Sequence, residues 1–263
     1  MAALLDNVTG ALAGSIRFSC TKCGHCCHNL NLPLTWNEAI AWLEEGGKVD
    51  IYCEADLWPS EPSAEDLRAA HRKRRSFQAA CGATHVRITA IFVAAISGAC
   101  KNLTSEMTCG IYDRRPLVCR IYPAEINPFI QLNPANKACP SEAWGSGEIL
   151  TIAGKVTDPS IQALIEKSRQ TDQDEAPQKD LLCRHLGLNV AALHRDGFIK
   201  YTPEPKTLLD GLHRMRGATL KSAGDGAPWR LYSPRTQTRE LLRANGAELA
   251  VARPEDRYCF LAA

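Results

Sequence analysis

The chain has 263 residues, of which 45% are hydrophobic and 23% are charged, and it contains 18 Gly, 15 Pro and 12 Cys. This composition is typical of a globular protein and excludes a disordered, collagen-like or coiled-coil chain. The cysteines fall well short of the roughly 8–10% of residues that marks a small disulfide-stapled secreted scaffold. A chain of this length can bury a hydrophobic core without disulfide bonds, so the cysteines need another explanation.

The charge balance is nearly neutral, with 31 Lys and Arg against 29 Asp and Glu. We therefore expect no nucleic-acid partner. The N-terminus lacks the basic and long apolar regions of a signal peptide, and the apolar run at residues 88–100 is too short to span a bilayer. We expect a cytoplasmic protein with no membrane partner, whose oligomeric state is left open. In a reducing compartment, clustered cysteines favour metal or redox chemistry over disulfides.

Local patterns predict three elements in the N-terminal half. Thr35 and Glu38 have the spacing of a capping box, which predicts a helix over residues 36–45. Acidic residues followed by basic ones predict a second helix over residues 64–80, and we interpret its basic run 72–75 as a solvated face rather than a phosphate site. The β-branched and aromatic run at residues 86–96 indicates one or two short buried strands, with a buried helix left open because periodicity alone does not separate the two.

A different pattern begins after the glycines near residue 146, where the cysteine clusters end. We expect an α+β fold in which a small metal-organised, loop-rich domain, residues 16–145, precedes a mainly helical extension of unknown role, residues 146–263. The elements expected in the extension are a helix from Pro159, a polar connector at 171–180, short helices at 181–186 and 190–194, a loop at 221–234, a helix at 238–245, and strands at 247–251 and 258–261.

Eight cysteines form two groups along the chain. The first group follows C-x2-C-x2-C spacing plus one adjacent cysteine, and the groups are Cys20, Cys23, Cys26 and Cys27, then Cys100, Cys109, Cys119 and Cys139. Tight spacing lets thiolates converge in one turn, which indicates a zinc site or an iron–sulfur cluster. Adjacent side chains project differently, so one of Cys26 and Cys27 is expected to face a second centre or the core. Two four-cysteine centres, or one cluster plus a second metal with mixed ligands, both remain open.

Other residues near the clusters have predicted roles. Arg115 and Arg120 are expected to lie around the centre as cationic hydrogen-bond donors that offset thiolate charge. His25 or His28 could replace a thiolate as a ligand. The remaining cysteines are isolated, and we expect them to pack in the core: Cys53, Cys81, Cys183 and Cys259.

The paired motifs resemble a known family. The cysteines of the first group, together with Cys109-Gly-Ile-Tyr-x-x-Arg115-Pro116-x-x-Cys119-Arg120-x-Tyr-Pro123 and Cys139, are similar to the CxxCxxCC or YkgJ-type family. That family is regarded as a zinc- or iron-chelating domain, and the resemblance covers residues 16–145. It implies a metal site built from the eight cysteines.

A more distant resemblance is to the flagellin lysine N-methylase, carried by Arg17-Phe18-Ser19-Cys20 and the Cys26-Cys27 pair. In that enzyme a similar cysteine set is associated with an iron–sulfur cluster. The resemblance implies S-adenosylmethionine as a cofactor, yet the chain has no Rossmann-type glycine signature.

We therefore predict an intracellular metal-binding protein whose eight-cysteine site holds iron. A 4Fe-4S iron–sulfur cluster is favoured, because C-x2-C-x2-C resembles ferredoxin ligation. The cluster would serve redox chemistry or modification of a partner, so a redox partner or a protein substrate is expected. One alternative is a structural zinc-binding interaction module, and the other is a protein lysine N-methylase-like enzyme that uses S-adenosylmethionine.

Overall fold

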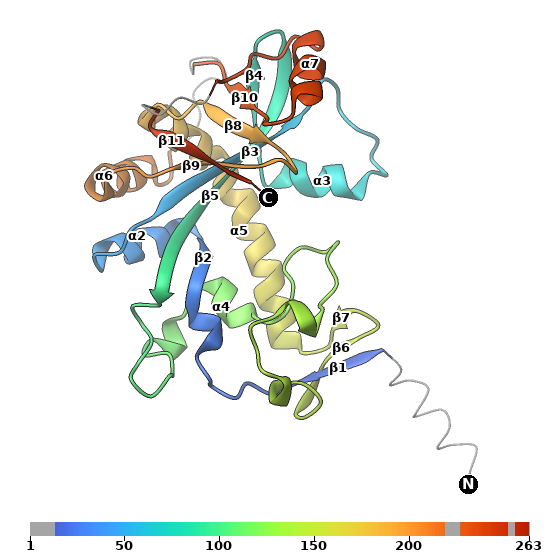
Figure 1. Cartoon of the computed structure of the whole chain (residues 1–263), viewed down its shortest axis with the longest axis vertical. Coiled ribbons are helices and arrows are strands. Elements are labelled where there is room, and N and C mark those ends of the chain that lie inside the picture. The colour runs from blue at the N-terminus through green and yellow to red at the C-terminus, as the bar shows by residue number, and fades with distance from the viewer. Residues whose placement is uncertain (1–13, 219–226, 252–255, 263) are drawn as a thin grey trace, which may run out of the picture. The chain divides into compact units, whose positions relative to one another are not determined.

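The computed structural model describes residues 14–218, 227–251 and 256–262, and it has the expected mixture of helices and sheets (Figure 1). Contacts divide the chain into two compact units. One, the cysteine unit, comprises residues up to Asn31 and Ile96–Gln170; the other, the sheet unit, comprises Leu32–Ala95 and residues from Thr171 onward. The units are thus interleaved along the chain, which differs from a boundary near residue 146. Three elements have residues in both units: strands β2 (His28–Leu34) and β5 (Thr84–Ala99) and helix α5 (Pro159–Leu186).

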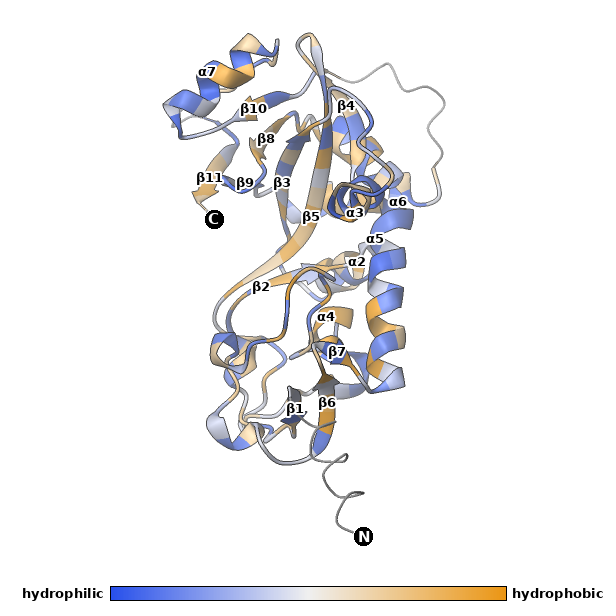
Figure 2. Ribbon diagram, turned by 90° about the vertical axis from the view of Figure 1, so that its right-hand side faces the viewer, coloured by the Kyte–Doolittle hydropathy of each residue, from blue (hydrophilic) through white to orange (hydrophobic). Residues whose placement is uncertain are grey.

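An eight-stranded sheet has the order β10-β8-β3-β5-β2, with β9 pairing β3 and β11, and β4 pairing β5. The strands are β2 (His28–Leu34), β3 (Asp50–Leu57), β4 (Phe77–Cys81), β5 (Thr84–Ala99), β8 (Val190–Leu193), β9 (Gly197–Tyr201), β10 (Arg230–Tyr232) and β11 (Tyr258–Ala262). The predicted strand region 86–96 is confirmed as part of the single strand β5. Its residues 86–94 are almost all buried, and Figure 2 shows the hydrophobic character of its middle.

The predicted helix after Thr35 is confirmed as α2 (Trp36–Glu44), including the reciprocal capping box with Glu38. Its Trp36 indole Nε1 donates to the Leu212 carbonyl oxygen over 3.3 Å, which joins α2 to another helix of the sheet unit. The other helices of this unit are α3 (Leu67–Arg74), α6 (Pro205–Met215) and α7 (Thr236–Ala244). The last confirms the helix predicted at 238–245.

One predicted helix is shorter than expected and another is a strand, because sheet pairing overrides local propensity. The helix predicted over 64–80 ends at Arg74, since Phe77–Cys81 pairs antiparallel with β5 as strand β4. The basic run 72–75 is not simply solvated, because its Arg72, Lys73 and Arg75 form ion pairs with Asp56, Glu61 and Asp172. The helix predicted at 190–194 is strand β8, which lies parallel to β10 and β3.

The remaining C-terminal predictions had mixed outcomes. The strand at 258–261 is confirmed as β11, whereas the strand at 247–251 is reduced to one bridge between Leu231 and Leu249. In the predicted loop 221–234, residues 221–226 lie outside the described residues and Arg230–Tyr232 is a strand. The extension is therefore mixed rather than mainly helical.

The polar connector predicted at 171–180 is also wrong, because α5 is one helix over Pro159–Leu186. Its polar residues have partners within the sheet unit. The buried Glu175 carboxylate accepts from the Trp36 backbone N–H over 2.7 Å and pairs with buried Lys179 over 3.1 Å. One turn later, Asp180 receives two hydrogen bonds from Arg184. These polar side chains make hydrogen bonds and ion pairs on a helix that is buried on one side, and they do not mark a loop.

The cysteine unit has a small sheet in the order β1-β6-β7 and a short helix, α4. The bounds are β1 (Ser15–Phe18), β6 (Glu148–Ile152), β7 (Lys155–Val156) and α4 (Leu117–Ile121). One hydrophobic cluster of this unit has the buried members Leu117, Ile121, Ala124 and Ile165, and Ala143 and Leu150 are buried as well. Much of the rest is loop, so other interactions must hold the chain in place. None of the helices in the described parts of the chain has the length and apolarity to cross a membrane.

Removal of the buried carboxylate of α5 tests this account of the connector. Glu175→Ala leaves the Trp36 N–H without its partner and leaves buried Lys179 with only the longer contact of 3.8 Å to Asp172, so we expect the free energy of unfolding to fall by about 3 kcal/mol. Glu166→Ala, an exposed carboxylate on the same helix, should change it by less than about 0.5 kcal/mol. Denaturant titration measures both, and equal effects would contradict the role of Glu175.

Candidate metal site

The first cysteine group lies in a loop that turns back on itself between β1 and β2. Lys22 has a φ of 54° and Gly24 a φ of 71°, so the chain twice adopts the left-handed conformation between the first three cysteines. A 3-10 helix, η2 (His25–Cys27), follows, and its Cys27 N–H donates to the Gly24 carbonyl oxygen over 2.9 Å. The turn therefore brings Cys20, Cys23 and Cys26 around one short stretch of backbone.

Gly24 is needed for a second reason besides its positive φ. A Cβ atom at this position would lie 2.9 Å from both the Met107 carbonyl oxygen and the Met107 Cε atom. The first cysteine loop is thus packed closely against the loop that carries the second group. The His28 ring nitrogen Nδ1 lies 3.0 Å from the Gly24 carbonyl oxygen, which further fixes the turn.

Backbone hydrogen bonds bring Cys100 and Cys109 to Cys27. The Cys100 N–H donates to the Cys27 carbonyl oxygen over 2.7 Å. The chain then forms a hairpin-like loop, in which Leu103 bridges Cys109 and the Gly110 N–H donates to the Asn102 carbonyl oxygen over 2.8 Å. Residues that are far apart in the sequence are therefore adjacent here through main-chain bonds.

Cys119 is positioned by α4. Leu117 and Ile121 lie on one side of this helix and are buried in the small core, which leaves Cys119 on another face. The Arg115 guanidinium donates from Nε to the Tyr112 carbonyl oxygen over 2.9 Å and from Nη1 toward the Cys119 carbonyl oxygen over 3.5 Å. It also lies 3.7 Å from the centre of the Tyr112 ring, so a cation is held beside the cysteines.

Cys139 is positioned by Tyr122. The Cys139 Sγ atom lies 3.7 Å from the Tyr122 hydroxyl, which also accepts from the Ala138 N–H over 2.9 Å. A few residues further on, the Ala143 carbonyl oxygen accepts from the Ser19 N–H over 2.9 Å. The segment after Cys139 is thus joined to the residue that precedes Cys20.

The thiols are close enough to influence one another's ionisation. Burial and the neighbouring Cys27, Cys20 and Cys23 raise the pKa of Cys26 to about 12. Burial, followed by the effect of Cys27 and Cys100, raises the pKa of Cys119 to about 12. Thiolates repel one another in a partly desolvated region, so a nearby cation would be needed to keep several of them ionised together.

The two other shifted thiols differ in their neighbours. Burial raises the pKa of Cys27, against a side-chain hydrogen bond with Cys26 and the charge of Arg115, and Cys100 and Cys109 raise it further. Burial raises the pKa of Cys139, with contributions from Cys26, Cys20 and Cys23 that oppose the Tyr122 hydrogen bond. All eight predicted cysteines therefore lie in one electrostatic neighbourhood within the cysteine unit.

The thiols have the right chemistry for zinc or iron, both of which bind thiolates well. Among the residues that the structure describes, no three His, Cys, Asp or Glu side chains are grouped closely enough to hold an ion as they stand. Binding would thus need rotation of the side chains about a backbone that already gathers them. His25 is exposed, and Arg120 is exposed at the end of α4, so their roles beside the cysteines stay predictions.

The isolated cysteines mostly lie where expected. Cys53, Cys81 and Cys183 are buried, which confirms core packing, whereas Cys259 is exposed on β11 and its prediction was wrong. A hydrogen bond with Cys183 and burial raise the pKa of Cys53 well above its usual value. All twelve cysteines are free thiols.

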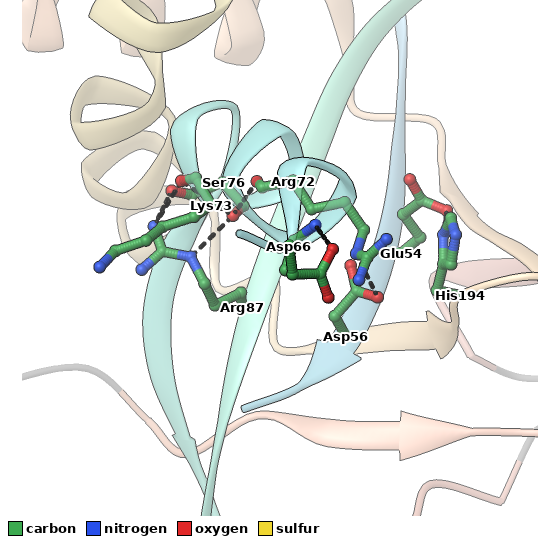
Figure 3. Close-up of polar contacts among 9 residues, drawn as sticks. Glu54, Asp56, Asp66, Arg72, Lys73, Ser76, Arg87 and His194 are labelled. Carbon is green, nitrogen blue, oxygen red and sulfur yellow. Dashed lines mark hydrogen bonds and ion pairs between the residues drawn. The ribbon is translucent and has the colours of Figure 1, made fainter. Parts of the chain in front are cut away.

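The sheet unit contains a polar cluster that the sequence patterns did not reveal (Figure 3). Glu54 and Asp56 lie two residues apart on β3, and His194 follows β8. The His194 Nδ1 atom lies 2.9 Å from a Glu54 carboxylate oxygen, and the Arg72 Nε atom lies 3.2 Å from an Asp56 carboxylate oxygen. Burial raises the pKa of Asp56 despite these cations. The sequence signal that could have revealed this cluster is the pair of acidic residues, Glu54 and Asp56, at alternate positions of one strand.

A second part of Figure 3 explains how α3 is held to the hairpin of β4 and β5. The buried Arg87 guanidinium donates to the Ser76 hydroxyl and to the Lys73 carbonyl oxygen, both over 2.8 Å, and also bonds the Ser76 carbonyl oxygen. Burial lowers the pKa of Arg87. These hydrogen bonds give partners to carbonyl oxygens at and after the C-terminal end of α3, so Arg87 has a structural role.

The fold and the site together define an α+β protein whose cysteine unit gathers eight thiols. Residues 19–140 match the CxxCxxCC family model, described as "Putative zinc- or iron-chelating domain". This match over residues 19–140 confirms the resemblance to the family that the cysteine motifs indicate. No curated protein and no solved structure matches the chain.

Substitution of Gly24 tests the tight approach of the two cysteine loops. Gly24→Ala adds about 1–2 kcal/mol of left-handed backbone strain and forces the Met107 segment to move, so both unfolding free energy and metal content should fall. Gly187→Ala is a matched control, because Gly187 has a φ of 69° but nothing within 4 Å of an added Cβ. It should cost stability yet leave metal content unchanged; equal metal loss in both variants would refute the proposed packing role.

The pH dependence of stability tests the pairing of His194. A hydrogen bond with Glu54 raises the pKa of His194 above its usual value of 6.5. The pairing therefore stabilises the fold fully below about pH 6.5, and this contribution is lost as the pH rises through the higher folded-state pKa. The difference in unfolding free energy between wild type and His194→Gln should shrink as pH rises above that value.

A matched variant separates this pairing from other effects at His194. Glu54→Gln should lower the pKa of His194, followed by NMR titration of its ring protons, because the charged partner is lost. An unchanged His194 titration in this variant would contradict the assignment.

Proposed function

We propose that the cysteine unit binds zinc or iron through the thiols of Cys20, Cys23, Cys26, Cys27, Cys100, Cys109, Cys119 and Cys139. The observation that carries this proposal is that main-chain bonds and the side chains of Arg115 and Tyr122 bring the cysteine-bearing segments together within one unit. Core packing alone does not explain it, since these thiols are intermediate or exposed whereas Cys53 and Cys183 are fully buried. Thiols gathered at partial exposure are accessible to a metal ion.

The polypeptide contributes the geometry and the charge balance. Four thiolates around a divalent ion leave a net charge of about −2, which nearby cations and N–H groups must offset. Arg115 is placed to do so, because it already lies beside Cys27 and Cys119. A bound metal would hold loops that the small hydrophobic core cannot hold, and zinc or iron would supply either structural cross-linking or electron transfer.

Iron remains the favoured metal, as an iron–sulfur cluster, on the strength of the C-x2-C-x2-C loop. Zinc is the alternative, because sites with four cysteine ligands are typical of structural zinc. An iron site would serve redox chemistry with a redox partner or modification of a protein substrate, and the lysine methylase reading rests on sequence resemblance alone. Cysteines remain free thiols in a reducing compartment, so we infer that the protein is located in the cytoplasm.

Metal content tests the proposal directly. The full chain, purified without oxygen, should contain stoichiometric zinc or iron by elemental analysis. Iron with broad visible thiolate-to-iron absorption would support the iron–sulfur assignment, and zinc with no visible absorption would support the structural alternative, because zinc is a d10 ion. A chain that contains neither metal and takes up neither after reduction would overturn the proposal.

Substitutions separate ligands from bystanders. Cys23→Ser and Cys119→Ser should each lower metal content and soluble yield, because each removes a proposed ligand. Cys183→Ser, a buried thiol outside the site, should leave metal content per folded molecule unchanged. Equal metal content in all three variants would remove the ligand assignment.

A further inference from the structure

We propose that Met107 is an oxidation site that regulates metal binding by the cysteine unit. When a peroxide oxidises its thioether, an apolar contact between the two cysteine loops becomes a polar one, and the site loses its metal more readily. This inference rests on the proposed function and adds a regulation of that site. The contact on which it depends joins Met107 to Gly24, neither of which is a proposed ligand.

Met107 is accessible to an oxidant in solution. The chain contains only three methionines, and the side chain of Met107 is a large apolar group at a position that is 38% exposed. Met215, near the end of α6 in the sheet unit, is partly buried, and Met1 lies outside the described residues. An exposed methionine is therefore present in the unit that gathers the thiols.

The methyl end of the Met107 side chain lies against Gly24. A Cβ atom added to Gly24 would lie 2.9 Å from the Met107 Cε atom and 3.2 Å from the Leu103 Cδ1 atom. Gly24 belongs to the first cysteine loop, whereas Met107 and Leu103 belong to the loop between Cys100 and Cys109. Because the thioether sulfur is bonded to that methyl group, oxidation adds an oxygen atom one bond away from the contact between the loops.

The backbone around Met107 is held in one conformation. Its φ of 60° lies in the left-handed region, which residues other than Gly, Asn and Asp seldom adopt. The Met107 N–H donates to the Thr104 carbonyl oxygen over 3.0 Å, and the Thr104 N–H donates to the Thr108 carbonyl oxygen over 2.8 Å. The hydroxyl oxygens of the two threonines lie 2.9 Å apart. These bonds fix where the Met107 side chain begins, so a change in its chemistry acts on the contact with Gly24.

The chemical step is a two-electron oxidation of the Met107 sulfur by hydrogen peroxide. The O–O bond breaks, one oxygen atom forms the bond to sulfur, and the other leaves as water with both protons. The product, methionine sulfoxide, is polar, and a polar group without a hydrogen-bond partner is costly against apolar neighbours such as Leu103. Its oxygen therefore favours water over the contact between the loops. Methionine sulfoxide reductases reverse the step.

The cysteine thiols also react with peroxide, but their products respond to different reductants. Dithiothreitol reduces disulfides and sulfenic acids, whereas methionine sulfoxide requires a sulfoxide reductase. A loss of metal binding that survives dithiothreitol and is reversed by the reductase thus reports on methionine.

Substitutions test the contact without any oxidant. Met107→Gln places a polar amide where the thioether lies, so the full, zinc-loaded chain should transfer zinc to a colorimetric chelator about tenfold faster than wild type. Met107→Leu keeps an apolar side chain and should transfer zinc at the wild-type rate. Met215→Gln, the matched change in the sheet unit, should do the same. A wild-type rate for Met107→Gln would overturn the proposal.

Oxidation of the unmodified chain covers a variant that fails to fold. Zinc-loaded wild type and Met107→Leu are treated with limiting hydrogen peroxide and then with dithiothreitol, and peptide mapping by mass spectrometry measures the sulfoxide at Met107. Wild type should then transfer zinc faster, Met107→Leu should not, and the sulfoxide reductase should restore the slow rate. Equal rates in the two proteins, or no sulfoxide at Met107, would contradict the regulation.

The same experiment separates this inference from the proposed function. A wild-type chain that binds neither zinc nor iron before any treatment would overturn the proposed function and this regulation with it. A chain that binds zinc but whose rate of zinc transfer is unaffected by the chemistry at Met107 would overturn the regulation alone.

Discussion

The cysteine unit depends on one electrostatic constraint, the proximity of eight thiols in a region with little hydrophobic core. Burial and mutual repulsion hold the pKa values of Cys26 and Cys119 at about 12, so without a cation these thiols stay protonated. A divalent metal reverses this preference, since it stabilises several thiolates at once. The same region buries few apolar residues, so metal binding and folding of these loops are expected to be coupled.

The backbone prepares the site before any ion is bound. Main-chain bonds join Cys27 to Cys100 and Ser19 to Ala143, so the long segments between the two cysteine groups return to the same place. The segment between the two groups carries Leu32–Ala95 of the sheet unit, so about half of the stretch that matches the family model, residues 19–140, lies outside the cysteine unit. The sheet unit has its own buried residues and its own polar cluster, in which His194 pairs with Glu54 and Arg72 pairs with Asp56.

Local signals in the sequence were reliable where the chemistry is local. The capping box at Thr35, the β-branched run of β5 and the cysteine spacing all depend on near neighbours, and each was read correctly. The predictions that were wrong concern segments whose structure depends on contacts with residues far away in the sequence. Strand β8 forms because β3 and β10 pair with it, and residues 171–180 are helical because Glu175 and Lys179 have buried partners. The approach of the two cysteine groups is equally non-local, since it depends on bonds between residues more than 70 positions apart, such as Cys27 and Cys100.

The central claim is that sulfur from this chain surrounds a metal ion. X-ray absorption spectroscopy at the zinc or iron edge of the full, anaerobically purified chain measures the ligand type directly. The account predicts a shell of sulfur atoms alone, at about 2.3 Å if the metal is zinc. A shell dominated by nitrogen or oxygen at about 2.0–2.2 Å would contradict it.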